Sequence, residues 1–318
     1  MTAAIQFSQV SKRYGSQIAL DGATFEVPSG KVFAMLGENG AGKTTAIRLM
    51  LGLAEAQAGE VRVLGRDSRR EGLEIRRRVG YVPERPTLYD WMTAAEIGWF
   101  TAGFYPDGFE HHYRTLVEQF GVPLKRKLKQ MSKGMRAKVA LSLAMAHRPE
   151  LLVLDEPTSG LDTMVRREFL ESMVDIAAEG RTVLLSSHQI GEVERVADIV
   201  AIIHTGRVLL VEPLNALKLD TRQLTVLTTE IQPSPPELPG TLLYQRQRGR
   251  QWELLVRGLE ESDVDTLRDD EAVISVESRM PSLEEIFVAY MRGESTNQAA
   301  QSNPKLRLRS FPRQSSAK

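Results

Sequence analysis

Gly37-Glu38-Asn39-Gly40-Ala41-Gly42-Lys43-Thr44-Thr45 is the stretch that decides the fold of this 318-residue chain. It fits the pattern G-x-x-x-x-G-K-[ST] of a phosphate-binding loop, or P-loop. An apolar run at residues 31–36 precedes it, and residues 45–51 carry apolar side chains at helical spacing. The sequence therefore predicts a buried strand, a glycine-rich turn and a helix, which is the context that this motif requires.

The physical chemistry of the motif indicates a bound nucleoside triphosphate. Glycines let backbone N–H groups curl around phosphate oxygens without Cβ clashes, and the N-terminus of the next helix adds unpaired donors. We expect Lys43 to reach the β- and γ-phosphates and the Thr44 hydroxyl to ligate Mg²⁺. The alternative is a glycine-rich turn that binds nothing, which the full match and the correct flanks disfavour.

The composition is that of an ordinary globular protein with room for two domains. Apolar residues make up 42% of the chain and charged residues 26%, and the 41 basic side chains equal the 41 acidic ones. This balance favours no nucleic-acid partner. The chain has no cysteine, no secretory signal and no apolar window of about 18 residues that would span a bilayer. A role at a membrane would need a span supplied by another chain.

The N-terminal region predicts two antiparallel strands. Residues 3–30 alternate apolar and polar side chains, with a turn at residues 14–16. Tyr14 beside this turn is either a core aromatic or a platform for a nucleobase. Because aromatic side chains are chiefly buried apolar mass, the residues alone favour the core.

Two further apolar runs end in residues that suit phosphate chemistry. Residues 151–156 end in Asp155 and Glu156, and residues 181–188 end in His188. Buried parallel strands deliver their C-terminal residues into the crevice where ligands bind in α/β sheets. Asp155 would ligate Mg²⁺ or its water, and Glu156 would orient or deprotonate an attacking water. Such strand ends are often structural, but the upstream P-loop favours a site here, with His188 near the γ-phosphate.

Residues 85–149 predict helices. The segment opens with aromatic residues that form either a small helical core or a surface that docks a partner, because interface cores favour Trp, Tyr and Phe. They are Tyr89, Trp91, Trp99, Phe100, Phe104 and Tyr105. Further on, Ser132 is placed to cap a helix, and Gly134 leaves a backbone N–H approachable. An ordinary capped helix would explain this second feature equally well.

After about Pro213 the composition shifts to short strand-like pieces at residues 223–227, 252–256 and 272–276, with a proline-rich connector at residues 232–240. One amphipathic helix follows, from Leu283 to Met291. We therefore expect a small α+β accessory domain at residues 213–293. Residues 294–318 are polar and basic and predict a disordered tail. Contact of this tail with anionic lipid is an alternative, but a passive tail is favoured.

The motifs at residues 37–45, 131–135, 151–156 and 159–162, followed by His188, occur in this order and together resemble the ATP-binding subunit of ABC transporters. The resemblance covers residues 4 to about 212, and the appendage is similar to those of exporter-type members with separate membrane subunits. It implies a fold of the α/β class: a P-loop NTPase core at residues 1–212, with an antiparallel β subdomain and a helical subdomain at about 85–150. It also implies that two copies dimerise head to tail around two ATP molecules.

The resemblance assigns roles by position. Tyr14 looks like the adenine-stacking aromatic, which reverses the preference for the core. Glu156 matches the catalytic base, His188 the switch histidine, and Asp162 a loop residue that communicates across the dimer. Ser132 and Gly134 match signature residues that face the partner's γ-phosphate, and Lys43 joins Glu156 and His188 as a catalytic residue. The residues implied to bind nucleotide are Tyr14, Gly37, Asn39, Gly40, Ala41, Gly42, Lys43, Thr44, Thr45, Ser132 and Gly134, and those implied to hold Mg²⁺ are Thr44, Glu84 and Asp155.

Two positions depart from the pattern of that family. Glu84 stands where the family usually has Gln, which keeps an oxygen ligand but adds negative charge near the triphosphate. The signature reads Ser-Lys-Gly-Met rather than Ser-Gly-Gly-Gln, so Lys133 adds a cation and Met135 forfeits a polar contact. Because Ser132 and Gly134 are kept, we expect competent hydrolysis.

The expected function is the ATP-hydrolysing subunit of a multi-subunit ABC exporter. It would drive a separate transmembrane permease at the cytoplasmic face of the cell membrane, with a second copy or a paralogue completing each ATP site. The alternative is a soluble ABC-type ATPase acting in translation or DNA maintenance. The single P-loop, the short spacing between Lys43 and Asp155 and the neutral charge balance disfavour it. A P-loop kinase or GTPase would leave the signature segment and His188 unexplained.

Overall fold

The computed structural model describes residues 3–105 and 107–302. The chain divides into two compact units, residues 1–214 and residues 215–318. Each unit has its own sheet or sheets and its own buried apolar cluster. Among the residues described, no helix is both long enough and apolar enough to cross a membrane.

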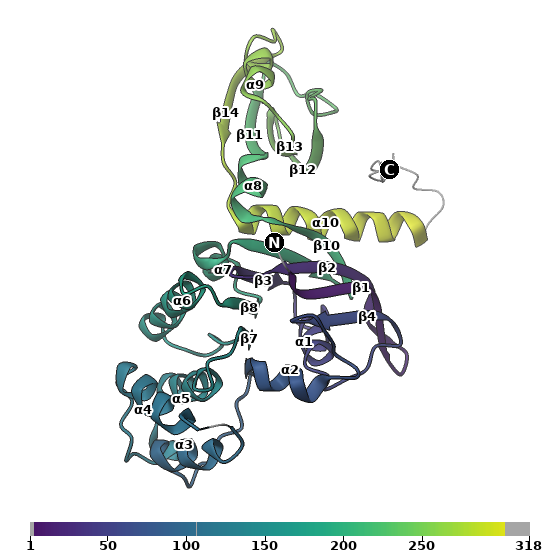
Figure 1. The fold of residues 1–318 in the computed structure, drawn as a ribbon. Coiled ribbons are helices and arrows are strands. Elements are labelled where there is room, and N and C mark those ends of the chain that lie inside the picture. The colour runs from purple at the N-terminus through teal and green to yellow at the C-terminus, as the bar shows by residue number, and fades with distance from the viewer. Residues whose placement is uncertain (1–2, 106, 303–318) are drawn as a thin grey trace. The chain divides into compact units, whose positions relative to one another are not determined.

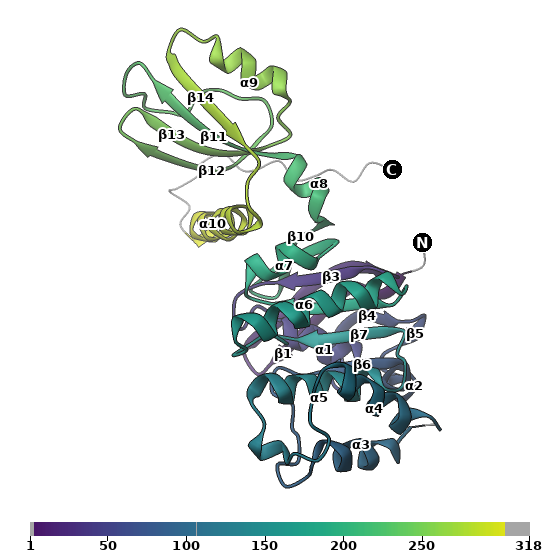
Figure 2. The same cartoon turned by 90° about the vertical axis from the view of Figure 1, so that its left-hand side faces the viewer.

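A six-stranded sheet forms the centre of the first unit (Figures 1 and 2). Its strand order is β10-β9-β3-β8-β7-β6, with β10 antiparallel to β9 and the other neighbours parallel. β3, β7 and β8 are buried along their whole length, which explains their uninterrupted apolar runs. The strands are β3 (Val32–Leu36), β6 (Val79–Val82), β7 (Leu151–Asp155), β8 (Thr182–Ser187), β9 (Ile199–His204) and β10 (Arg207–Pro213).

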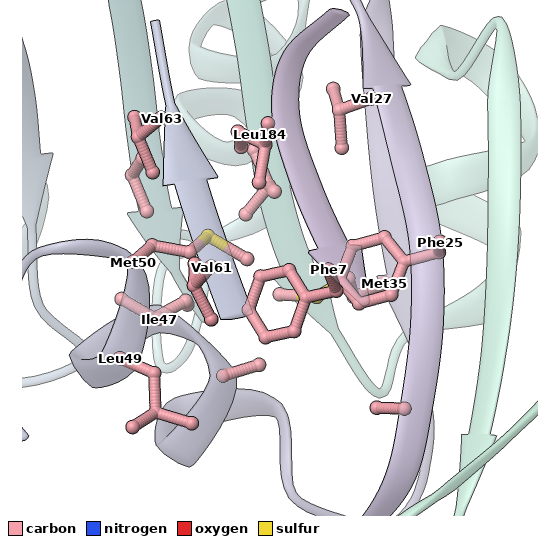
Figure 3. Close-up of a cluster of buried hydrophobic side chains, with 14 of the residues drawn as sticks. Phe7, Phe25, Val27, Met35, Ile47, Leu49, Met50, Val61, Val63 and Leu184 are labelled. Carbon is pink, nitrogen blue, oxygen red and sulfur yellow. The ribbon is translucent and has the colours of Figure 1, made fainter. Parts of the chain in front are cut away.

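A four-stranded antiparallel sheet packs against one face of this parallel sheet. It has the order β2-β1-β4-β5, and the pairing of β1 with β2 confirms the predicted antiparallel strands. Phe7 and Phe25 stack with ring centroids 4.5 Å apart, and Phe25 lies 5.9 Å from Phe33 of the parallel sheet. Figure 3 shows this core, to which the first helix contributes Ile47 and Met50. The strands are β1 (Ala3–Tyr14), β2 (Gln17–Pro28), β4 (Ala58–Val63) and β5 (Arg66–Asp67).

The helices of the first unit fall into two groups (Figure 1). One group covers the sheets: α1 (Lys43–Met50), α2 (Gly72–Arg78), α6 (Thr163–Ala178) and α7 (Ile190–Val196), of which α6 and α7 contact β3. The other group forms a helical lobe: α3 (Ala94–Ala102), α4 (Phe109–Gln119), the 3₁₀ turn η1 (Leu128–Gln130) and α5 (Lys133–Met145).

Tyr113 is the centre of the core in this helical lobe. It is fully buried, and its hydroxyl donates to the Ala94 carbonyl at 2.7 Å. A Cβ at Gly98 would lie 2.1 Å from the Tyr113 ring, so only glycine allows this approach of α3 to α4. The lobe therefore has a core of its own, but of the six aromatic residues at its start only Tyr105 packs against that core, and the other five are exposed.

The second unit contains one antiparallel sheet of order β12-β13-β11-β14. Its elements are β11 (Thr221–Thr228), β12 (Thr241–Arg248), β13 (Gln251–Arg257), α9 (Glu261–Arg268), β14 (Val273–Arg279) and α10 (Leu283–Ser302), and α8 (Leu214–Leu219) contains the boundary between the units. Sequence analysis missed β12 and α9. Because α10 extends to Ser302, the first part of the stretch 294–318 is helical, contrary to the predicted disorder. The remainder of that stretch lies outside the described residues.

Candidate functional site

The P-loop connects the end of β3 at Leu36 to the start of α1 at Lys43. Gly42 has a φ of +113°, and a Cβ there would lie 2.4 Å from the Ala19 carbonyl oxygen. A Cβ at Gly37 would lie 2.4 Å from the Ile203 carbonyl oxygen. Two glycines are thus required because the loop is confined between neighbouring backbones. No side chain caps α1, and its first turn has no acid, so its N-terminal N–H groups are available to an anion.

The Lys43 side chain bends back over this loop. Its Nζ donates to the Gly37 carbonyl at 2.7 Å and to the Glu38 carbonyl at 3.3 Å. The same atom lies 3.1 Å from Glu156 Oε1, although this oxygen is not aligned to accept a hydrogen bond. The contact between Lys43 and Glu156 is therefore an ion pair held by charge, within a site where both side chains are nearly buried.

Asp155 ends β7, and Glu156 follows in the left-handed backbone region with a φ of +48°. The Ser186 hydroxyl at the end of β8 joins the two residues. It donates to Asp155 Oδ1 at 2.6 Å and accepts from the Glu156 backbone N–H at 3.1 Å. Sequence analysis did not single out Ser186. The signal was available, because this serine is the last but one residue of an apolar strand and lies two residues before His188.

His188 completes the group, because its Nδ1 lies 2.7 Å from Glu156 Oε2. Its backbone N–H donates to the same oxygen at 3.3 Å. The structure thus brings together Lys43, Glu156 and His188, which come from three segments that follow β3, β7 and β8. These strands are neighbours in the parallel sheet, and their carboxyl ends meet at one edge.

Glu84 lies on an exposed bend beyond β6, the strand next to β7. In the part of the chain that the structure describes, its side chain has no hydrogen bond or ion pair. It lines a cleft with Lys133, Ser159 and Gly160. The structure therefore brings Glu84 near the signature segment and the turn after Glu156, and it shows no contact between Glu84 and the P-loop.

Ser132 and Asp162 are both helix caps. The Ser132 hydroxyl accepts from the Met135 N–H at 3.2 Å at the start of α5, and Asp162 Oδ1 accepts from the Val165 N–H at 3.0 Å at the start of α6. A Cβ at Gly134 would lie 2.8 Å from a Val165 methyl group, so this glycine lets α5 approach α6. The signature segment and the turn before α6 are thus packed together.

Tyr14 ends β1 with 47% of its surface exposed, so the interpretation as a core residue is wrong. The Lys12 ammonium lies 5.1 Å from the centre of its ring. An exposed ring of this kind can stack on a ligand.

Comparison with known proteins identifies the family. The family profile described as ABC transporter matches residues 20–159. The bacitracin transport ATP-binding protein BcrA of Bacillus licheniformis is 34% identical over 226 residues, covering 70% of this chain and 74% of that protein. The chain belongs to the ATP-binding subunits of ABC transporters.

Other relatives of this ABC subunit have similar roles in their names. The Nod factor export ATP-binding protein I of Burkholderia thailandensis is 36% identical, with 64% of this chain and 69% of that protein covered. The lantibiotic transport ATP-binding protein SrtF of Streptococcus pyogenes is 32% identical, with 65% and 89% covered. A solved ATP-binding subunit of an ABC transporter is 32% identical with a TM-score of 0.62, covering 68% of this chain and 92% of that one.

These findings confirm the predicted fold class and the predicted activity. This ABC subunit is an ATPase with a P-loop NTPase core, and it acts as the ATP-hydrolysing component of a multi-subunit transporter. The alternative of a soluble factor in translation or DNA maintenance gains no support from these relatives.

Proposed function

We propose that this ABC subunit hydrolyses ATP to drive export through a separate transmembrane permease, at the cytoplasmic face of the cell membrane. Its relatives named above serve bacitracin transport, Nod factor export and lantibiotic transport. The observation that carries the chemical part of the proposal is the meeting of Lys43, Glu156 and His188 at the carboxyl edge of the parallel sheet. This group lies directly beside an uncapped helix N-terminus that can take phosphate.

In the proposed mechanism, Lys43 exchanges its contacts with Gly37 and Glu156 for phosphate oxygens. The backbone N–H groups of residues 37–45 hold the β-phosphate. Release of Lys43 leaves one Glu156 oxygen for the attacking water, while His188 holds the other oxygen and fixes the direction of the carboxylate. The exposed Tyr14 ring would stack on adenine.

The residues present also fit a Mg²⁺ ion, because the Thr44 hydroxyl and the Asp155 carboxylate are hard oxygen ligands of the kind it prefers. When bound, the ion would neutralise charge on the phosphates. Asp155 is only 2% exposed, and the hydrogen bond from Ser186 fixes one of its oxygens. Glu84, on the exposed bend beyond β6, remains a proposed further ligand.

A second copy of this chain, or a paralogue, would complete the site. Its Ser132 and the backbone of Gly134 would face the γ-phosphate from the N-terminus of α5, and its Asp162 would lie at the dimer contact. Lys133 is exposed beside this helix start, so it would add positive charge there. One chain alone should therefore hydrolyse ATP slowly.

A continuous aromatic surface on the helical lobe is the proposed docking site for the permease. Tyr89 contacts Trp91 and Phe100, with ring centroids 6.1 Å and 5.6 Å apart, and Phe100 lies 5.5 Å from Phe104. Trp91 is 64% exposed and Phe104 73%, and Trp99, which precedes Phe100 on α3, is 66% exposed. A lobe with its own buried core does not need these rings for folding, and exposed aromatic patches mark interaction sites.

Steady-state hydrolysis by the full chain tests the chemical proposal. Glu156→Gln should lower kcat by about 100-fold or more, because the amide cannot accept a proton from water. Glu171→Gln, which changes the same charge in a surface ion pair, should leave kcat unchanged. Hydrolysis by Glu156→Gln at the rate of the unchanged protein would contradict the assignment of Glu156.

Co-purification tests the docking proposal. The chain would be expressed with a membrane protein encoded beside it, and Trp91→Glu and Trp99→Glu should lower its recovery in detergent extracts. Leu73→Glu, at a residue of α2 that is 58% exposed, serves as the control. Full recovery with both tryptophan variants, at unchanged thermal stability, would exclude this surface.

A further inference from the structure

Glu192 on α7 carries a further, largely buried carboxylate near the catalytic group, and sequence analysis did not single it out. Its side chain is 12% exposed. Oε2 accepts from the Thr158 hydroxyl at 2.6 Å, and Oε1 lies 3.0 Å from Arg166 Nε. Glu192 Oε1 and Arg166 Nε are not aligned for a hydrogen bond, so the contact between Glu192 and Arg166 is an ion pair.

The two partners of Glu192 belong to one short turn and the helix that follows it. Thr158 is 2% exposed and lies two residues after Glu156. Arg166 on α6 donates from Nη2 to the Leu161 carbonyl at 2.9 Å. One carboxylate therefore fastens both ends of the turn at residues 158–161 to α7.

These contacts close a ring that passes through the catalytic group. α7 begins two residues after His188, and His188 contacts Glu156 through Nδ1. The Glu156 carbonyl in turn accepts from the Ser159 N–H at 3.1 Å, inside the turn that Glu192 holds. Glu156 itself has a left-handed backbone, a conformation that persists only where its surroundings fix it. The contact from Glu192 to Thr158, two residues after Glu156, supplies such a constraint.

We propose that Glu192 is a positioning residue for ATP hydrolysis, which fixes the turn at residues 158–161 and, through it, the direction of Glu156 towards His188. The proposal rests on the function proposed above, because it assigns the chemistry to Glu156 and His188. Glu192 contacts neither the P-loop nor Lys43 in the described part of the chain. Its loss should therefore reduce turnover without weakening the binding of ATP.

Four variants of the full chain separate the two contacts. Thr158→Val removes the hydroxyl and keeps the shape, and Arg166→Met removes the charge and keeps the stem. Glu192→Ala removes both contacts, whereas Glu192→Gln keeps an oxygen for Thr158 and loses only the charge. We expect kcat to fall roughly tenfold in Thr158→Val and Glu192→Ala, because a small misplacement of a catalytic group is costly. The fall should be smaller in Glu192→Gln and Arg166→Met, which keep the contact with Thr158.

Two properties distinguish positioning from a general structural role. KM for ATP should stay within about twofold of the unchanged protein, because a lost transition-state contact lowers kcat and kcat/KM together. Adding Thr158→Val to Glu192→Ala should lower kcat no further, since both act through one contact. Arg167→Met and Glu171→Gln, from a neighbouring surface ion pair, are matched controls that should leave kcat unchanged.

Amide hydrogen exchange of residues 158–161 gives a readout that does not depend on catalysis. Exchange should quicken in Glu192→Ala and Thr158→Val. Unchanged exchange, unchanged kcat, or a raised KM at unchanged kcat would each overturn the proposal. Failure of the proposed function has a different signature: Glu156→Gln would hydrolyse ATP normally whatever the exchange of residues 158–161 shows.

Discussion

Lys43 Nζ and Glu156 Oε1 lie 3.1 Å apart, which joins the lysine that is proposed to bind phosphate to the acid that is proposed to activate water. Their side chains are only 6% and 10% exposed. A buried carboxylate is unfavourable without a partner, so each charge supports the other within the folded chain. Movement of Lys43 towards phosphate would therefore release Glu156 at the moment when its carboxylate is needed.

Substitutions of Lys43 and Glu156 should have non-additive effects on the free energy of unfolding, because the two side chains form an ion pair. Lys43→Met leaves the Glu156 carboxylate buried without its cation, and we expect the free energy of unfolding to fall by about 3 kcal/mol. Lys43→Met combined with Glu156→Gln should recover part of this loss. Denaturant titration measures the free energy of unfolding of both variants. Lys138→Met, which breaks the half-exposed ion pair with Glu168, is the control and should cost under about 1 kcal/mol. Strict additivity of the two changes would show that the contact contributes nothing.

Ser186 should matter for both stability and turnover. Ser186→Ala removes the buried donor to Asp155 and one of the two acceptors of the Glu156 N–H, whose bond to the Ser186 backbone carbonyl remains. We expect a loss of about 2 kcal/mol in unfolding free energy and a fall in kcat of about tenfold. Ser172→Ala, at a hydroxyl that donates to the Phe169 carbonyl within α6, is the control for both measurements. A variant with normal kcat would show that Asp155 and Glu156 do not need this hydroxyl.

Gly98 should tolerate no side chain. Gly98→Ala would bring a methyl group to 2.1 Å from the Tyr113 ring, so α3 must move away from α4. We expect a loss of about 2 kcal/mol in unfolding free energy. Gly191→Ala on α7, where a Cβ meets nothing within 4 Å, should instead be neutral or stabilising by up to about 1 kcal/mol. Equal effects of the two changes in thermal denaturation would argue against the packing of this lobe.

His147 should make the chain less stable in mild acid. Burial lowers the pKa of its imidazole from the ordinary value of 6.5, and the ring stacks on Tyr105 with centroids 4.6 Å apart. As pH falls below about 6.5, the unfolded chain takes up this proton before the folded chain does, so stability decreases with falling pH. His147→Phe should flatten this part of the stability profile, measured by urea titration at several pH values. An unchanged slope in His147→Phe would contradict this origin of the acid sensitivity.

The P-loop and the strands around it were predictable because their signals are local. β3, β7 and β8 are buried on both faces and therefore appear as apolar runs, and each leads directly into residues of the candidate site. β12 was missed because most of its residues are exposed or half-buried, which hides the alternation of a strand. Glu192 and Arg166 were missed for a different reason. Their importance comes from contacts between segments distant in sequence, and neither residue ends an apolar run.

The close packing of Gly134 against Val165 limits how these two positions can change in evolution. Between α5 and α6, the branched side chain of Val165 occupies the space that a side chain at residue 134 would need. A mutation that enlarges residue 134 would be tolerated where residue 165 has already become smaller. The two positions should therefore covary among descendants of this gene, which links inheritance of the signature segment to a helix that carries no part of the signature.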